Sequence, residues 1–207
     1  MIRFALFAVA LALLPGKPAM ATEEPPYTVQ LTQGAFELRD YPALVVAEVA
    51  VTGDRRAAAS KGFRILAGYI FGGNTRSRKI AMTAPVVQSP AAGESIAMTA
   101  PVVQTGAGGA WIVRFVMPHG STLDSLPRPN DPKVQLRAQS AARLAVVRFS
   151  GLAGQDDVAA QTLALQRFIT EQHLRPIGPP ALAQYDPPWV LWFMRRNEMM
   201  IAVARAG

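Results

Sequence analysis

The chain has 207 residues, of which half are apolar and 17% are charged, and its formal net charge is +7. This length and composition predict one globular domain with a sizeable core rather than a disordered chain. Because the chain contains no cysteine, disulfide bonds, thiolate catalysis and Cys-ligated iron or zinc are excluded.

The beginning of the chain has the pattern of a secretory signal peptide. Arg3 supplies a positive charge, residues 4–14 form an unbroken apolar run, and residues 19–21 give a small–x–small cleavage pattern. At about 1.5 Å per residue, the run is too short to cross a bilayer core of about 30 Å. We therefore expect a signal peptide over 1–21, a single domain over 22–207, and a periplasmic or secreted protein without a stable membrane span. An N-terminal anchor that is not cleaved is the alternative.

Periodicity in the first half of the domain predicts strands around one helix. The expected strands are 27–33, 36–41 and 44–51 before the helix, and 78–88, 95–104 and 111–118 after it. Asp54 is a good N-cap for the helix, and Gly72-Gly73-Asn74 is typical of a helix end. The expected buried face of this helix is made of Ala59, Phe63, Leu66 and Ile70.

The second half repeats this order after a proline-rich connection over 118–133. The expected elements are strands at 134–138 and 144–149, a helix at 155–173, and strands at 181–185 and 192–203. The expected buried residues of the second helix are Val158, Leu165 and Ile169, with Phe168 beside them.

Two internal repeats are visible in the domain. The segments 36–39 (Phe-Glu-Leu-Arg) and 134–137 (Val-Gln-Leu-Arg) occupy equivalent places in the two runs of elements. This predicts an α+β architecture of two similar halves, about 27–118 and 119–203, whose helices pack on a shared curved sheet.

The second repeat is exact: Ile-Ala-Met-Thr-Ala-Pro-Val-Val-Gln occurs at 80–88 and again at 96–104. If the two copies pair as a hairpin, Met82 and Met98 alternate with alanines on one face of the sheet. Such a face would have depressions beside polarizable sulfur atoms, which suits an apolar ligand.

This doubled segment resembles the signature of the SOUL heme-binding proteins, which follows a helix ending in Gly-Gly-Asn. Further blocks that resemble the family are 115–118, 126–130, 185–189 and 195–198, and the resemblance covers roughly residues 27–203. It implies a distorted eight-stranded antiparallel β-barrel-like sheet with two helices and pseudo-duplicated halves. It also implies heme or another tetrapyrrole as the ligand, often without an agreed axial residue.

A hydrophobic cleft beside the first helix is the expected heme site. A porphyrin is a flat apolar plate with two carboxylates, so it requires an apolar wall and basic groups. The expected cofactor-binding residues are Lys61, Phe63, Arg64, Leu66, Tyr69, Ile70, Met82 and Met98. Core packing is the alternative for the two methionines, and simple solvation is the alternative for the two charges.

No side chain stands out as the iron ligand. The candidates are His119, Met82 and Met98, with Tyr41 and Tyr69 as phenolic candidates. Some family members carry a histidine before the tyrosine that ends the second strand, but Asp40 occupies that place here. We therefore expect heme as the cofactor and no metal site of the protein's own.

Trp189, Trp192 and Phe193 form the richest aromatic cluster of the chain. They either line a ligand site or seal the end of the expected barrel, and of these we expect sealing. The nearby prolines hold the segment stiff.

The chain lacks the common catalytic motifs: there is no G-x-S-x-G, no H-E-x-x-H and no glycine-rich phosphate loop before a helix. Its basic residues are scattered, which does not favour nucleic-acid binding. We expect a monomeric, non-enzymatic carrier or buffer of heme or another tetrapyrrole. The alternatives are a binding module for another amphipathic small molecule and an enzyme of unknown reaction.

Overall fold

A computed structural model describes residues 22–91 and 109–204. In the first half the elements are β1 Thr28–Gln33, β2 Phe36–Tyr41, β3 Leu44–Thr52, α1 Arg55–Ile70, β4 Val86–Pro90 and β5 Ala110–Val116. In the second half they are β6 Gln135–Gln139, β7 Ala142–Ser150, α2 Gln155–Glu171, β8 Ala181–Gln184, the 3-10 helix η1 Trp192–Met194 and β9 Arg196–Val203. Neither helix of this described part is long and apolar enough to cross a membrane.

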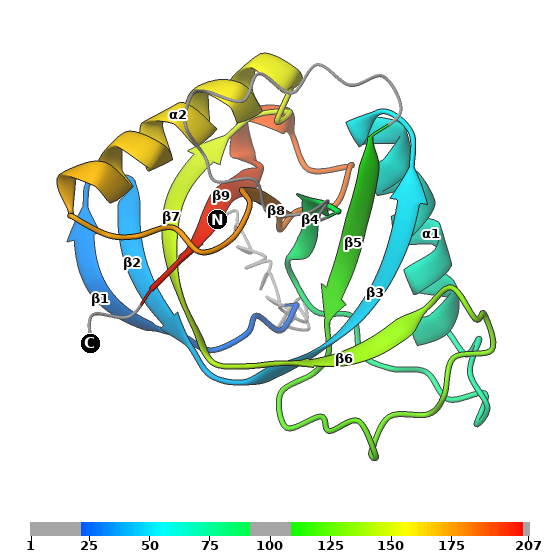
Figure 1. Cartoon of the computed structure of the whole chain (residues 1–207). Coiled ribbons are helices and arrows are strands. Elements are labelled where there is room, and N and C mark those ends of the chain that lie inside the picture. Colours follow the sequence, from blue (N-terminus) through cyan, green and yellow to red (C-terminus); the bar gives the residue numbers. More distant parts are fainter. Residues whose placement is uncertain (1–21, 92–108, 205–207) are drawn as a thin grey trace, which may run out of the picture.

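The strands form one curved antiparallel sheet in the order β1-β2-β7-β9-β8-β4-β5-β3-β6. Both helices lie on the outer side of its curve (Figure 1). The α+β class with two helices is therefore confirmed. The expected eight-stranded barrel-like closure is wrong, because the sheet has nine strands and no ladder among the described residues joins β1 to β6.

The strand order has an internal symmetry. With β1 left out, the sheet runs β2-β7-β9-β8 from one end and β6-β3-β5-β4 from the other. Along the chain, a first series of elements begins at β2 and a second series begins at β6. Each series contains one helix. The two sides of the sheet meet at the β4–β8 ladder, which has three registered pairs. Each side contains one strand from the other series, because β2 pairs with β7 and β6 pairs with β3.

Helix α1 begins at the expected cap, where the side chain of Asp54 accepts a hydrogen bond from the Ala57 N–H at 2.9 Å. Its buried face is made of Ala58, Gly62, Leu66, Tyr69 and Ile70. The predicted face is therefore wrong at Ala59, which is half-buried, and at Phe63, which is 37% exposed although its ring packs edge-on against Phe115 of β5, with ring centroids 5.3 Å apart. The reason is Gly62, where an added Cβ would stand 2.6 Å from the Cβ of Val113.

Each helix covers its own apolar core. Under α1, the buried residues of β3 and β5 are Ala47, Val49, Val51, Val113 and Phe115. Under α2, the core contains Leu165, Phe168 and Ile169 of the helix together with residues of β7 and β9. The prediction for the face of α2 is thus confirmed at these three positions.

The expected strand over 78–88 is shorter than predicted and begins only at Val86. Before it, hydrogen bonds of the chain go to other elements: the Ile80 N–H donates to the Ile70 carbonyl at 2.8 Å, and Thr83 pairs with Glu23. Pro85 has no N–H to offer a ladder. The second copy of the motif, with Met98 and the expected hairpin, lies outside the described residues.

Candidate functional site

The inner face of the sheet, the face away from the helices, is polar at its centre. Because side chains alternate along a strand, Leu38 and Met199 enter the core under α2. Their neighbours Arg39 and Glu198 therefore point to the inner face. Both side chains are fully buried there.

Glu198 is the centre of a group of side chains that we call the inner cluster: Arg39, Arg148, Tyr185, Arg196 and Glu198. The carboxylate of Glu198 accepts hydrogen bonds from Arg39 at 2.8 and 3.1 Å, from the Tyr185 hydroxyl at 2.6 Å, and from Arg196 at 2.8 and 3.0 Å. Arg148 adds a longer contact of 3.4 Å. The carboxylate thus faces three guanidinium groups and one phenol.

The charges of the inner cluster are fixed by their partners. Burial tends to raise the pKa of Glu198, but the hydrogen bonds from Arg39 and Tyr185 outweigh it and hold that pKa below its usual value. Burial and the Glu198 carboxylate raise the pKa of Tyr185, and burial raises the pKa of Tyr41 to about 12. Both phenols therefore stay protonated near neutral pH.

A short N-terminal segment, residues 22–27, lies against the inner cluster, and we call it the strap. Both carboxylate oxygens of Glu24 contact Nη1 of Arg196 at 3.0 Å. The ring of Tyr27 lies 4.3 Å from the guanidinium carbon of Arg39 and 5.2 Å from the ring of Tyr41. The strap therefore presents one carboxylate and one aromatic ring to the arginines.

The other end of the strap binds the opposite half of the sheet. The Glu23 carbonyl accepts a hydrogen bond from the Ala84 N–H at 2.8 Å, and the Glu23 side chain accepts one from the His119 N–H at 2.6 Å. The segments that carry two predicted iron ligands, Met82 and His119, thus meet at Glu23. The side chains of Met82 and His119 are both exposed.

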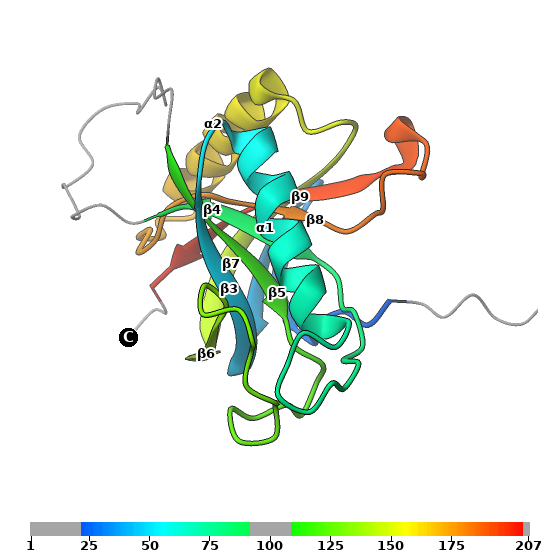
Figure 2. The same ribbon diagram turned by 90° about the vertical axis from the view of Figure 1, so that its right-hand side faces the viewer.

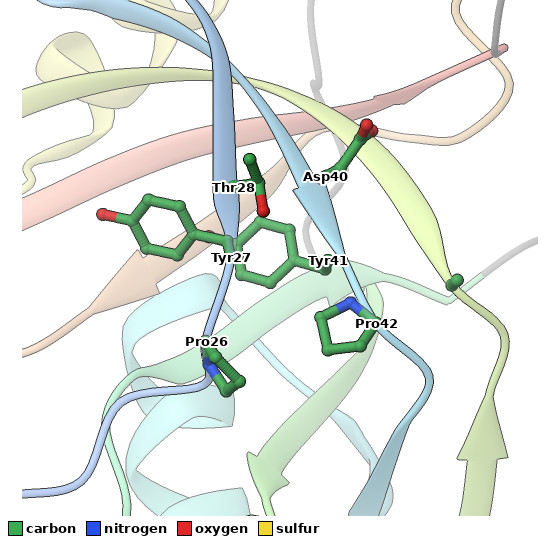
Figure 3. Close-up of a pocket in the computed structure, with 7 residues that line it drawn as sticks. Pro26, Tyr27, Thr28, Asp40, Tyr41 and Pro42 are labelled. Carbon is green, nitrogen blue, oxygen red and sulfur yellow. The ribbon is translucent and has the colours of Figure 1, made fainter.

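An open hollow of about 360 Å³ lies beside the strap (Figure 3). Its lining residues come from the strap, the start of β1, the end of β2 and the turn before β7: Pro26, Tyr27, Thr28, Asp40, Tyr41, Pro42 and Ala141. Figure 3 shows the two tyrosine rings next to each other at its wall. Tyr27 and Tyr41 therefore border both the hollow and Arg39.

The segment between β8 and β9 forms an exposed aromatic loop, which we define as residues 189–194. The exposed fractions are 81% for Trp189, 58% for Leu191 and Trp192, 54% for Phe193 and 65% for Met194. The loop projects from the end of the β8–β9 pair (Figure 2). The expectation that these aromatic residues seal a barrel end is therefore wrong, because their side chains face solvent.

Polar contacts at its base hold the aromatic loop in shape. Arg195 donates through Nε to the Val190 carbonyl at 2.8 Å and through Nη2 to the Pro188 carbonyl. Asp186 accepts a hydrogen bond from the Arg196 N–H at 2.6 Å. The apolar surface is thus presented by a braced turn.

The helix residues predicted to bind heme separate into two groups. Leu66, Tyr69 and Ile70 are buried between α1 and the sheet, and the Tyr69 hydroxyl donates to the Pro127 carbonyl at 2.9 Å. These three side chains hold the helix on its strands, and their role in an apolar wall for a ligand stays a prediction. Lys61, Phe63 and Arg64 are exposed, and their role in ligand binding stays a prediction.

No resident metal site is evident in the described ranges, where no three His, Asp or Glu side chains gather as a metal would require.

Sequence reasoning missed the inner cluster and the strap. The available signal was the presence of Arg39 and Glu198 inside strands whose neighbours are buried, since charged residues in such places are paired.

Comparison with solved structures places this fold among several proteins of low sequence identity. The C-terminal domain of EcmrR superposes with a TM-score of 0.58 at 11% identity, covering 87% of this chain and 99% of that one. An uncharacterized conserved protein from Listeria innocua gives 0.56 at 13% identity, with 82% and 92% covered. A hydrolase from the same organism gives 0.55 at 13% identity, with 84% and 94% covered. These similarities show the fold alone.

Comparison with curated proteins finds no match. The family model described as SOUL heme-binding protein matches residues 22–202, which is nearly the whole of the described chain. The motif at 80–88 and the blocks around β9 lie inside this match, together with the inner cluster and the aromatic loop. The chain belongs to the SOUL heme-binding protein family.

Proposed function

We propose that this protein is an exported, non-enzymatic binder of heme or a related tetrapyrrole that acts as a carrier or buffer, and that the tetrapyrrole lies on the aromatic loop. Membership of the SOUL family supports the ligand class. The observation that carries the site is the exposure of five apolar side chains within residues 189–194. Soluble proteins rarely leave such a patch open unless it contacts a partner or ligand.

The chemistry of the aromatic loop fits the ligand. A porphyrin is flat and apolar, and burying a few hundred Å² of it at about 25 cal/mol per Å² supplies several kcal/mol. Trp192 and Phe193 are in edge-to-face contact, with ring centroids 5.6 Å apart, and offer two ring surfaces. Arg195 stands at the base of the loop, where a guanidinium can pair with a propionate.

A hemin titration followed in the Soret band tests this proposal. We expect a saturable shift near one equivalent for the unchanged protein, and at least about tenfold weaker binding when Trp189 and Trp192 are both replaced by alanine. Phe71→Ala is the matched control, because Phe71 is a 61% exposed aromatic residue at the far end of α1. It should bind hemin as the unchanged protein does.

Two outcomes would overturn the proposed site. A flat titration of the unchanged protein would remove heme as the ligand. Full affinity in the Trp189/Trp192 variant would remove the aromatic loop, and loss in Phe63→Ala would then move the site to α1, as the sequence predicted.

Two finer proposals accompany the function. The symmetric strand order supports an origin of the halves, about 27–118 and 119–203, by duplication. The leader pattern of residues 1–21 supports export. Mass spectrometry of the protein recovered from a cell-surface or periplasmic fraction should give a mature chain starting near Thr22, whereas a full-length chain in the cytoplasmic fraction would contradict export.

A further inference from the structure

The strap imitates a ligand on the inner face of the sheet. Glu24 supplies a carboxylate to Arg196, and Tyr27 supplies a flat ring to Arg39. An aromatic carboxylic acid offers the same two groups in one small molecule. We propose that the inner face is a second binding site, for a small aromatic anion, and that the strap occupies this site until such an anion displaces it.

The charges of the inner cluster support an anion rather than a cation. Three guanidinium groups, from Arg39, Arg148 and Arg196, converge on the single carboxylate of Glu198. The remaining counter-charges are Glu37, which pairs with Arg39 at 2.6 Å, and Glu24 of the strap. Without Glu24 the group has three positive and two negative charges, so that departure of the strap leaves a surplus positive charge.

The aromatic part of the ligand follows from the surfaces that the strap covers. The guanidinium of Arg39 has the ring of Tyr27 over it, and Arg196 lies 3.8 Å from the centroid of the Tyr185 ring. A planar guanidinium stacks well on aromatic faces. A ligand ring that replaces Tyr27 would therefore keep the same contact with Arg39.

The position of the hollow adds an independent argument. It adjoins the strap, and Tyr27 forms part of its wall. Movement of Tyr27 would join the hollow of about 360 Å³ to the space that the ring now fills. The ligand class follows from the groups that would be replaced, the Glu24 carboxylate and the single Tyr27 ring, which match an aromatic anion of one or two rings. The heme site of the proposed function lies elsewhere, on the aromatic loop.

The contacts of Glu24 and Tyr27 are of a kind that a ligand can replace. The side chain of Glu24 is 40% exposed, and exposed ion pairs contribute little to stability. Glu23 holds the strap at the other end through backbone pairing with Thr83 and Ala84. This end can stay in place while residues 24–27 move away from the arginines.

The test uses the fluorescent anion 1-anilinonaphthalene-8-sulfonate, with 2-naphthoate as a competing carboxylate. Glu24→Gln weakens the hold of the strap, so we expect the dye to bind up to about fivefold more tightly than to the unchanged protein. Glu171→Gln is the charge-matched control, since Glu171 is an exposed carboxylate on α2, on the other side of the sheet. It should leave the affinity unchanged.

A second pair of variants tests the arginines. Arg148 is 48% exposed and has one long contact with Glu198, so Arg148→Gln should fold and should bind the dye severalfold more weakly. Arg167→Gln, on α2, is its control and should have no effect. Equal affinities for Glu24→Gln and Glu171→Gln, or for Arg148→Gln and Arg167→Gln, would overturn the proposal.

Substitutions in the aromatic loop distinguish the inner site from the heme site of the proposed function. Loss of dye binding in the Trp189/Trp192 variant would place the dye on the loop and would also overturn the inner site. Unchanged dye binding in that variant, together with a lost hemin shift, supports two separate sites. A flat hemin titration with dye binding that still depends on Glu24 would leave the inner site standing and remove the heme proposal alone.

Discussion

The environment of Glu198 shows how a buried charge is kept in a protein interior. An isolated carboxylate in this position would be costly, yet Glu198 has hydrogen bonds from Arg39, Tyr185 and Arg196. Removal of the carboxylate leaves fully buried Arg39 without its main partner. The stability of the inner cluster therefore depends on Glu198 more than on any exposed pair around it.

Glu198→Ala should lower the free energy of unfolding by about 3–5 kcal/mol, because it leaves a buried guanidinium without its counter-ion. The measurement is urea unfolding followed by circular dichroism. Glu37→Ala is the comparison, since the Glu37 side chain is 22% exposed and Arg39 keeps Glu198 as its buried partner, and its loss should cost less, about 1–2 kcal/mol. Equal effects of the two substitutions would contradict this account.

The lowered pKa of the Glu198 carboxyl predicts how the free energy of unfolding changes with pH. The folded pKa of Glu198 lies below its ordinary value of 4.5, so its ionised form is favoured by folding. Its contribution is present above pH 4.5 and is lost as the pH falls through the folded pKa. Urea unfolding at a series of pH values should show a decline below about pH 4.5 that is smaller in Glu198→Gln. An identical decline in both proteins would assign the acid sensitivity to other carboxylates.

At the scale of the element, the approach of α1 to β5 depends on one glycine. An added Cβ at Gly62 would meet Val113 at 2.6 Å, whereas one at Gly68 on the same helix would meet nothing within 4 Å. Gly62→Ala should therefore destabilise the protein by about 1–3 kcal/mol through overpacking. Gly68→Ala should stabilise it by about 0.5–1 kcal/mol through helix propensity. Thermal unfolding of both variants checks this, and a shift of the same sign would contradict the packing described for α1.

Most helices and strands could be predicted from the sequence, because hydrophobic periodicity and helix-capping residues are local signals. Both helices, the Asp54 cap and the strand order along the chain follow from them. The face of α1 could not be predicted, since hydrophobic period favours Phe63 while the close approach at Gly62 turns the helix by a fraction of a turn. The shortened β4 has a similar cause: residues before Val86 bond to α1 and the strap, which are tertiary contacts.

The candidate site was less predictable than the fold. Apolarity alone selected Leu66, Tyr69 and Ile70, but the same property placed them in the core. The exposed residues of the aromatic loop are of the same apolar types as core residues, so the sequence alone does not distinguish them. The pairing of Arg39 with Glu198 spans 159 positions, so only the sheet order brings these two side chains together.

At the scale of the whole molecule, two cores under two helices share one sheet. The two cores meet through the three pairs of the β4–β8 ladder, and through a chain of contacts in which Gln88 donates to the Arg55 carbonyl at 2.8 Å and Arg55 donates to the Ala153 carbonyl at 2.5 Å. The two halves of the chain are also interlocked, because β2 of the first half pairs with β7 and β6 of the second half pairs with β3. The strap adds a link on the inner face, because the Glu23 carbonyl binds Ala84 before β4 and the Glu24 side chain binds Arg196 of β9. These links predict that the two cores unfold together.

Leu66→Ala and Leu165→Ala test this coupling, because each removes a fully buried side chain from one core. Each should lower the free energy of unfolding by about 2–5 kcal/mol. If the two cores are coupled, both substitutions shift one calorimetric transition, and its calorimetric and van't Hoff enthalpies stay equal. Two separated transitions, with each substitution lowering only one of them, would show that the β4–β8 ladder and the strap are too weak to join the cores. In that case the symmetric strand order would describe two independent folding units that share a sheet.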